Sequence, residues 1–354
     1  MPRLNRKDEH IIYSMLELPG RADFSDIQFV HNCLPDQDFS EVSLDTVYLG
    51  RTFRSPLFIN AITGGTKMAL RINAALAEVA RKTDLPMAVG SQMTALENKN
   101  AVSSFTIVRR INPDGVIWAN IGSYANPELV LKAIKMIRAD GVQIHLNVPQ
   151  ELVMREGECR FRGMIDRISA ITKEINVPVI VKEVGFGIAG EQASLLIGSN
   201  VSAIDVGGKG GTNFLKIERR RSGLKSSWEL DSWGIPTVIS LLEVAAVSRN
   251  KIDLFASGGM HASIDIAKAL ALGANAVGFA GLPVRLLIKY GRDALEEYIN
   301  TTEKELRIIM MMLGVSSIGA LQHVPLVIGG NTAEWMQRRG FDPSAYAKRS
   351  NSTC

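Results

Sequence analysis

Short apolar segments recur eight times along the chain, each followed by a polar or glycine-rich turn and then by an amphipathic stretch. They are apolar enough to be buried on both faces, which is typical of strands in a parallel sheet. The segments are PLFIN (56–60), PMAVG (86–90), VIWANIG (116–122), VQIHLN (142–147), VPVIVK (177–182), AIDVG (203–207), DLFASG (253–258) and AVGFA (276–280).

Helix signals fill the gaps between these segments. The stretch 126–141 has Asn126 at the N-cap position, Pro127 at the first helical position and Gly141 as its expected end. The stretch 261–274 follows the same pattern and closes at Gly273. Eight alternations of strand and helix predict an α/β fold, and eight strands are the number that closes a TIM (β/α)8 barrel. The alternative is an open doubly wound sheet. The first strand is not followed by a GxGxxG turn, which argues against this alternative.

Length and composition agree with one large globular unit. The chain has 354 residues, of which 46% are apolar and 21% charged. A barrel uses about 250 residues and accepts insertions. We therefore expect a single domain over residues 1–354, with residues 1–55 as an N-terminal extension.

Charge and cysteine content narrow the class of protein further. The net charge of +4 is compatible with an anionic small molecule and far from a nucleic-acid-binding signature. Cys33, Cys159 and Cys354 are scattered without metal-like spacing, which suits a reducing compartment. No run of eighteen apolar residues is present, so we expect a cytoplasmic protein without stable membrane association.

Chemistry in a barrel lies at the carboxyl ends of the strands. The turns after the seventh and eighth strands, Ser257-Gly258-Gly259 and Ala280-Gly281, match the recurrent phosphate site of this fold, where backbone N–H groups face the anion. The first strand runs into Ala61-Ile62-Thr63-Gly64-Gly65, whose backbone N–H groups can face a planar ligand or its phosphate.

Lys182 follows the buried stretch VPVIV, so its ammonium should emerge at the barrel mouth. There it can pair with an anion or with the pyrimidine edge of a reduced flavin. A Schiff-base lysine and a plain solvent-exposed strand end are the other interpretations, and Lys182 alone does not decide among them.

The densest polar cluster follows the fourth strand and contains His145, Asn147, Gln150 and Glu151. His145 and Asn147 are two residues apart, so on a strand they share one face, either in the site or as a polar pair satisfied in the core. Glu151 is an isolated carboxylate, which suits Mg²⁺ held by one protein ligand and substrate phosphate oxygens.

Two further segments carry charge. Residues 208–232 are too long for an ordinary turn and predict a lid loop, in which Arg219-Arg220-Arg221 are either solvated or near a diphosphate. The start of the chain, RKDEH (6–10), predicts a helix with a charged beginning. His10, His31 and His261 lie outside the predicted strands and are interpreted as solvated.

In their order along the chain, the motifs RKDEH, ITGG, GSQ, NIG, HLNVPQE, VKEVGFG, DVGGKGGTN, SGGM and AGLP resemble the FMN-dependent type 2 isopentenyl-diphosphate Δ-isomerases. The resemblance covers nearly the whole chain. It implies a flavin-dependent barrel in which the N-terminal extension folds over the mouth, of the same or of a neighbouring subunit. Loss of a side chain at Gly207, where many members have Ser, is the visible departure.

The resemblance also implies roles for individual residues. Arg6 and Lys7 would bind the diphosphate, with Ser91, His145, Asn147 and Gln150 as further substrate-site residues. Gln150, His145 and Lys182 would be catalytic, and Glu151 would bind Mg²⁺. The residues expected to hold FMN are Ala61, Ile62, Thr63, Ser91, Asn120, Lys182, Gly207, Thr212, Gly258, Gly259, Met260, Ala280 and Gly281. Met260 would contribute through its backbone alone.

The family's reaction interconverts isopentenyl and dimethylallyl diphosphate by a 1,3 proton shift, with FMN kept reduced by NADPH or NADH, of which we expect NADPH. This fits the reading that no Asp/Glu pair or activated Cys stands at the strand ends to protonate an alkene, so that the flavin nitrogens would move the proton. The resemblance further suggests a homo-oligomer, tetrameric or larger. An FMN-dependent 2-hydroxy-acid oxidase, a Schiff-base aldolase and a flavin-binding regulator without turnover are the rival interpretations.

Overall fold

Eight parallel strands close into a barrel in the order β10-β11-β4-β5-β6-β7-β8-β9. The structure is a computed structural model that describes residues 3–16, 20–223, 229–248 and 251–350. Each of the eight predicted segments overlaps one barrel strand, and pairing of β11 with β4 closes the ring, so the TIM-barrel prediction is confirmed and the open sheet excluded. The strands are β4 (Leu57–Ile59), β5 (Met87–Ala88), β6 (Ile117–Gly122), β7 (Gly141–Leu146), β8 (Val179–Glu183), β9 (Ala203–Asp205), β10 (Asp253–Ser257) and β11 (Ala276–Phe279).

Helices surround the barrel and follow the predicted alternation. They are α2 (Lys67–Thr83), α3 (Met93–Glu97), α4 (Ser103–Ile111), α5 (Pro127–Ile137), α6 (Val148–Val153), α7 (Met164–Glu174), α8 (Gly190–Gly198), α9 (Phe214–Arg221), α10 (Thr237–Ser248), α11 (Ser263–Ala271) and α12 (Gly281–Tyr290), with short 3-10 turns at Phe39–Glu41, Lys99–Ala101 and Glu229–Ser232.

The predicted end of α5 is wrong. Asn126 caps the helix by accepting a hydrogen bond from the backbone of Leu129, as expected. The helix ends at Ile137, however, because Arg138 takes the left-handed conformation with φ 48° and closes it. Gly141 instead begins β7, where an added Cβ would lie 3.1 Å from the Trp118 ring. Its missing side chain therefore serves packing against the neighbouring strand.

The amino-terminal end of the barrel is plugged by aromatic rings. Phe58, Trp118 and Phe255 fill the interior, with ring centroids 5.2 to 5.8 Å apart. Tyr48, on the hairpin of β2 (Thr46–Tyr48) and β3 (Arg51–Phe53), lies 5.2 Å from the Phe255 ring and covers them from outside. Each such ring buries on the order of 200 Å² and contributes a few kcal/mol of hydrophobic free energy. Ligands therefore have access only from the opposite end.

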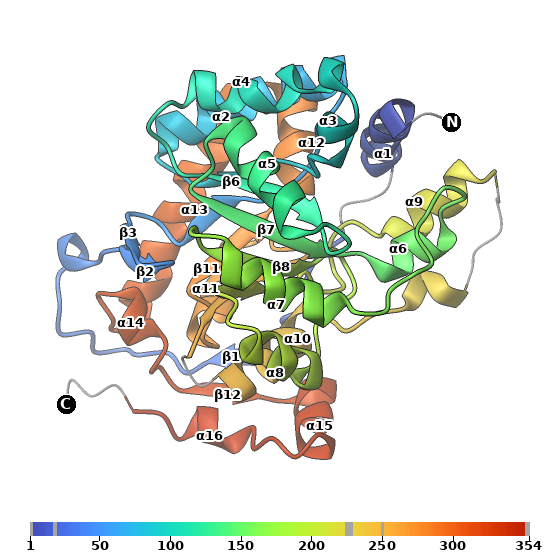
Figure 1. The fold of residues 1–354 in the computed structure, drawn as a ribbon. Coiled ribbons are helices and arrows are strands. Elements are labelled where there is room, and N and C mark those ends of the chain that lie inside the picture. Colours follow the sequence, from blue (N-terminus) through green and yellow to red (C-terminus); the bar gives the residue numbers. More distant parts are fainter. Residues whose placement is uncertain (1–2, 17–19, 224–228, 249–250, 351–354) are drawn as a thin grey trace.

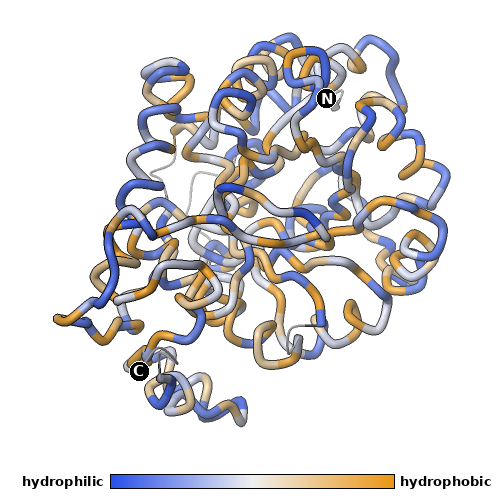
Figure 2. Tube along the Cα trace, turned by 90° about the vertical axis from the view of Figure 1, so that its left-hand side faces the viewer, coloured by the Kyte–Doolittle hydropathy of each residue, from blue (hydrophilic) through white to orange (hydrophobic). Residues whose placement is uncertain are grey.

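That opposite end is covered by the N-terminal helix α1 (Arg3–Leu16). In Figure 1, α1, α6 and α9 lie on the right of the barrel, and β2 and β3 lie on the left. Figure 2 looks onto that left-hand side, where hydrophobic stretches run through the centre and hydrophilic ones alternate with them around the rim. Helix α1 packs against α9 and α2 of its own chain.

Segments near the two ends of the chain pair in a two-stranded sheet outside the barrel. Strand β1 (Ile27–Phe29) pairs antiparallel with β12 (Leu326–Ile328). One hydrophobic core contains Ile11 and Phe24 of the extension together with Leu306 and Leu326 near the other end. This shared core favours the single domain, which stays a prediction. The remaining helices are α13 (Arg292–Met312), α14 (Ile318–Leu321), α15 (Gly330–Arg338) and α16 (Ser344–Ala347).

The segment after the sixth strand is not a plain loop, which corrects the expectation for residues 208–232. It contains helix α9, because the side chain of Asn213 accepts a hydrogen bond from the backbone of Lys216 and starts the helix. Arg219, Arg220 and Arg221 form its last turn, where basic side chains favour a helix C-terminus. Residues 224–228 of the predicted lid lie outside the described residues. Among the described helices none is long and apolar enough to cross a membrane.

Candidate active site

A deep pocket opens at the carboxyl ends of the barrel strands and beneath α1. Every residue that the sequence analysis assigned to the site lines it, so the structure brings the whole predicted set together. The ligand contacts assigned to each of them stay predictions. Side chains that were not predicted line the same wall, among them His10, Glu183, His261 and Arg285.

One part of the pocket is built from closely packed backbone. Gly258 and Gly259 have φ of 108° and 78°, and an added Cβ would lie 2.2 Å from Gly208 O and 2.1 Å from Gly210 O respectively. Only glycine fits where these two turns meet. Next to them Gly281 begins α12, whose first N–H groups favour an anion. This part of the pocket fits a phosphate group.

Two buried polar atoms in the pocket wall have no hydrogen-bond partner among the described residues. They are Thr63 Oγ1 and Arg6 Nε. A buried polar atom left without a partner costs about 1–3 kcal/mol. A ligand that supplies partners for a hydroxyl beside the first strand and for a guanidinium on α1 would remove this cost. The residues present therefore fit a bound cofactor and an anionic substrate.

Lys182 is buried in the pocket wall, so the interpretation as a solvent-exposed strand end is wrong. Its Nζ donates to Glu183 O at 2.9 Å and lies 4.0 Å from Asp205 Oδ2. The neighbouring Glu183 accepts a hydrogen bond from the Phe186 backbone. Burial nevertheless raises the pKa of the Glu183 carboxyl to about 8. Lys182 therefore supplies a fixed positive charge next to a carboxyl group that is mostly neutral at pH 7.

His145 lies at the end of β7 with its Nδ1 2.7 Å from Asn120 Oδ1. Burial, together with the charges of Lys182 and Lys7, lowers the pKa of His145 to about 3. The imidazole is therefore neutral. Asn147 does not pair with it but follows the strand as the first residue before α6, where its Nδ2 donates to Glu151 Oε1 at 2.7 Å. The two side chains face the pocket rather than each other.

Glu151 is held in place by two donors. Besides Asn147, the backbone N–H of Glu158 donates to its Oε2 at 2.8 Å. No group of three His, Cys, Asp or Glu side chains that would bind a metal by itself exists in the described part of the chain. A cation at Glu151 would therefore need oxygen ligands from a bound molecule, which suits Mg²⁺ and a phosphorylated substrate.

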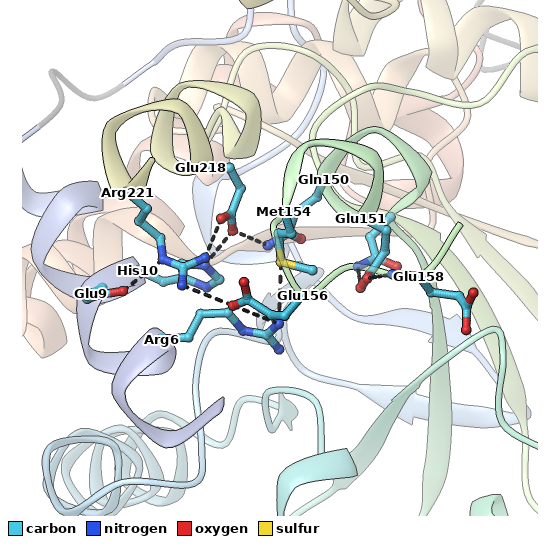
Figure 3. Close-up of polar contacts among 11 residues, drawn as sticks. Arg6, Glu9, His10, Gln150, Glu151, Met154, Glu156, Glu158, Glu218 and Arg221 are labelled. Atoms are coloured by element: carbon cyan, nitrogen blue, oxygen red, sulfur yellow. Dashed lines mark hydrogen bonds and ion pairs between the residues drawn. The ribbon is translucent and has the colours of Figure 1, made fainter. Parts of the chain in front are cut away.

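His10 and Glu218 form a largely buried pair at the pocket mouth (Figure 3) that the sequence analysis missed. His10 Nε2 lies 2.7 Å from Glu218 Oε1, and Gln150 Nε2 donates to the same oxygen at 3.3 Å. Burial lowers the pKa of His10, so its interpretation as a solvated histidine is wrong. Burial opposes ionisation of Glu218, but the His10 hydrogen bond and the Arg221 charge lower its pKa overall. Gln150 thus contacts a carboxylate.

Arg221 connects three segments above the pocket (Figure 3). Its Nε lies 2.9 Å from Glu9 Oε2 on α1, its Nη2 lies 3.1 Å from Glu156 Oε1 after α6, and its Nη1 pairs with Glu218 on α9. Arg219 pairs with Asp231 at 2.8 Å. These two arginines form structural ion pairs and are not a solvated face. The i, i+3 spacing of Glu218 and Arg221 was the signal in the sequence.

Two acidic side chains stand at strand ends, and each is held by donors of its own. Glu183 ends β8, and Asp205, fully buried, ends β9. His261, after the seventh strand, and Arg285, after the eighth, also line the wall. Arg285, however, donates to Ser14 O and Met15 O at the end of α1.

Gly207 is required by the backbone. Its φ is 48°, and an added Cβ would lie 1.9 Å from Glu183 O. Its carbonyl accepts hydrogen bonds from Gly185 and Gly187, at 2.7 and 3.2 Å. The departure from serine at this position therefore goes with a turn in which β8 and β9 approach each other too closely for any side chain.

Sequence comparisons identify relatives over nearly the whole chain. The family model for FMN-dependent dehydrogenase matches residues 19–148 and 150–327. A protein of Geobacillus sp. (strain WCH70), named isopentenyl-diphosphate delta-isomerase, is 47% identical over 99% of this chain and 100% of its own length. One of the same name from Moorella thermoacetica is 44% identical over 95% of this chain and 97% of its own.

Solved structures show the same fold at low identity. Mandelate oxidase with (S)-2-phenylpropionate superposes with a TM-score of 0.67 at 18% identity, over 90% of this chain and 94% of that one. At this identity the likeness concerns the barrel alone. The full-length match to the named relatives is more specific, and the chain belongs to the isopentenyl-diphosphate delta-isomerase family of enzymes, on the barrel of the FMN-dependent dehydrogenases.

Proposed function

We propose that the protein interconverts isopentenyl diphosphate and dimethylallyl diphosphate by a 1,3 proton shift, with reduced FMN and Mg²⁺ bound in the pocket, as a step of isoprenoid biosynthesis. One observation carries the proposal. The same pocket contains a glycine-built phosphate cradle and, on α1, the cations Arg6 and Lys7. Two anionic groups, one of the cofactor and one of the substrate, can therefore be bound in one cavity.

The residues that would hold FMN follow from the fit of the wall. Gly258, Gly259 and Gly281 would take the phosphate through backbone N–H groups. The Thr63 hydroxyl, which has no partner among the described residues, would form a hydrogen bond with the cofactor. Lys182 would face the flavin ring as a buried positive charge. The remaining contacts would come from Ala61, Ile62, Ser91, Asn120, Gly207, Thr212, Met260 and Ala280. Reduced flavin supplies nitrogen atoms that exchange protons at neutral pH.

The substrate diphosphate would lie between α1 and α6. Arg6 and Lys7 approach from α1, and Glu151 would bind Mg²⁺ that the diphosphate oxygens complete. Asn147 and Glu158 hold the Glu151 carboxylate ready for this. The ion pairs that Arg221 makes with α1 and its neighbours would then help to exclude water from the reacting carbon atoms.

Proton handling by this chain would centre on Gln150, His145 and Lys182. The isomerisation adds one proton to the substrate and removes another, without net oxidation. Gln150 would position the alkene or relay a proton, since its amide is held by Glu218. Lys182 would stabilise negative charge on the cofactor. His145 is neutral and so can accept a hydrogen bond.

NADPH would reduce the flavin, and the reductant would be needed to prime the enzyme rather than once per turnover. We also propose a homo-oligomer, tetrameric or larger, in the cytoplasm, with the small-molecule diphosphate as its partner and no nucleic acid.

The proposal is tested by separating turnover from cofactor retention. We expect Gln150→Asn to lower isomerisation at least about tenfold, because a side chain shortened by one methylene no longer reaches, while the yield of bound FMN is unchanged. Unchanged turnover would remove Gln150 from the mechanism. The rival 2-hydroxy-acid oxidase is tested by mixing oxidised protein with lactate or mandelate. Reduction of the flavin by either acid would contradict the isomerase assignment.

A further inference from the structure

Five buried polar side chains form a continuous row across the barrel, between the aromatic plug and the pocket. Asn60 Nδ2 donates to Asp205 Oδ2 at 2.6 Å, and Gln143 Nε2 donates to Asn60 Oδ1 at 3.0 Å. Asn120 Nδ2 donates to Gln143 Oε1 at 3.0 Å, and Asn120 Oδ1 lies 2.7 Å from His145 Nδ1. The row thus joins the end of β9 to His145 on β7.

The direction of every hydrogen bond in this row follows from one backbone group. The N–H of Ala61 donates to Asn60 Oδ1 at 2.8 Å. A backbone N–H can only donate, so the Asn60 amide is fixed with its oxygen toward Ala61 and Gln143. Its nitrogen then faces the Asp205 carboxyl, whose other oxygen accepts from Ser257 Oγ.

The fixed orientation of Asn60 sets the orientation of each amide along the row as far as the histidine. Gln143 must present its nitrogen to Asn60 Oδ1, so its oxygen faces Asn120. Asn120 must then present its nitrogen to Gln143, and its oxygen faces His145. An oxygen acceptor requires a proton on the facing ring nitrogen. The Nδ1 of His145 therefore carries the hydrogen.

The buried surroundings keep each amide of the row in a single orientation. All members of the row are buried, and Phe58, Trp118 and Phe255 lie beneath it. Gly278 leaves the space for the Phe58 ring and for Asn60, since an added Cβ there would lie 2.4 Å from the ring and 3.0 Å from Asn60 Nδ2. An amide that turned over in this interior would face donor with donor and acceptor with acceptor, which is costly away from water.

We propose that Asn60, Gln143 and Asn120 are positioning residues that hold His145 as the Nδ1–H tautomer and so present the bare Nε2 of His145 to the pocket. His145 is then a hydrogen-bond acceptor. One further consequence, which rests on the proposed function, concerns the binding of a diphosphate substrate. Diphosphate oxygens carry no hydrogen to give, so a direct hydrogen bond from Nε2 to the substrate requires His145 to take up a proton on binding.

The tautomer is measured by ¹⁵N NMR of the flavin-loaded full-length protein labelled at histidine, which separates protonated from bare ring nitrogens. We expect His145 to show Nδ1–H and bare Nε2 at pH 7, with the signal identified by its loss in His145→Asn. Gln143→Met keeps the size of the side chain and removes the link. We expect it to shift the tautomer ratio toward Nε2–H by about tenfold, the value of one buried hydrogen bond.

A matched control separates the row from buried amides in general. Gln92 is equally buried, donates to Ala133 O and accepts from the Asn120 backbone, but is no member of the row. Gln92→Met should leave the tautomer unchanged. Asn120→Ala, which removes the acceptor itself, should lose the Nδ1–H preference and serves if Gln143→Met does not fold.

Three results would overturn the inference: Nε2–H in the wild-type protein, an unchanged tautomer in Gln143→Met or Asn120→Ala, or an equal shift in Gln92→Met. None of these measurements depends on turnover. Failure of the isomerase assay with the Nδ1–H tautomer present would therefore contradict the proposed function and leave the tautomer inference intact.

Discussion

Arg221 Nε and Glu9 Oε2 lie 2.9 Å apart, which joins the helix after the sixth barrel strand to the N-terminal helix across the pocket mouth. The two residues are 212 positions apart in the sequence. The same guanidinium also pairs with Glu156 and Glu218. Three acidic side chains would repel one another without it, so Arg221 joins α1, the segment after α6 and α9 through its ion pairs.

We expect Arg221→Ala to loosen α1. Removing one partner of a buried ion network costs roughly 3 kcal/mol, and the three carboxylates would then separate. Hydrogen–deuterium exchange of residues 6–16 should become about 100-fold faster, by the free energy of local opening. Arg338→Ala breaks an exposed i, i+4 pair with Glu334 and should leave that exchange unchanged. Equal exchange in both variants would show that Arg221 does not hold α1 in place.

Gly207 should not tolerate a side chain. Gly207→Ala places a methyl group 1.9 Å from Glu183 O at a φ of 48°, so we expect a loss of roughly 2–4 kcal/mol in the free energy of unfolding. The bound FMN should fall as well, because the turn lines the pocket. Gly198→Ala, with no atom near the added methyl group, is the control and should be neutral or slightly stabilising. Urea unfolding of both variants decides, and equal stabilities would refute the requirement.

Stability should fall in acid because of His145. Its pKa is about 3 in the folded protein and 6.5 unperturbed. Between these values the unfolded chain binds a proton that the folded chain does not, so the free energy of unfolding decreases as the pH is lowered below 6.5, at up to about 1.4 kcal/mol per pH unit. His145→Gln should remove this contribution. Urea unfolding at pH 6 and pH 4 would show parallel losses in both proteins if His145 does not contribute.

Magnesium binding should depend on the diphosphate. Glu151 is a single carboxylate, and it belongs to no group of three metal-binding side chains among the described residues. Mn²⁺, used as a paramagnetic substitute for Mg²⁺, should therefore bind weakly to the substrate-free protein. Addition of isopentenyl diphosphate should tighten binding at least about tenfold, and Glu151→Gln should abolish the increase. Tight binding of Mn²⁺ before the diphosphate is added would contradict this site.

The sequence predicts the barrel well because its strands are continuous apolar runs that need no distant information. It predicts the pocket wall equally well, since residues at strand ends meet at one edge of a barrel. It fails where contacts are distant: His10 and Glu218 are 208 residues apart, and neither segment alone indicates the other. It also fails at Arg138, which takes a left-handed conformation usually reserved for glycine. Asn213 caps α9 within 208–232, but the many charged residues of that segment are equally typical of a loop, so the sequence does not indicate the helix.

The central claim is isomerisation without net oxidation, and one assay tests it directly. The flavin-loaded protein is incubated without oxygen with isopentenyl diphosphate, Mg²⁺ and an amount of NADPH far below that of the substrate, and the products are analysed. We predict that dimethylallyl diphosphate forms in many-fold excess over the NADPH consumed, up to the equilibrium mixture. If no dimethylallyl diphosphate forms, or if it forms only in step with NADPH oxidation, the account is wrong.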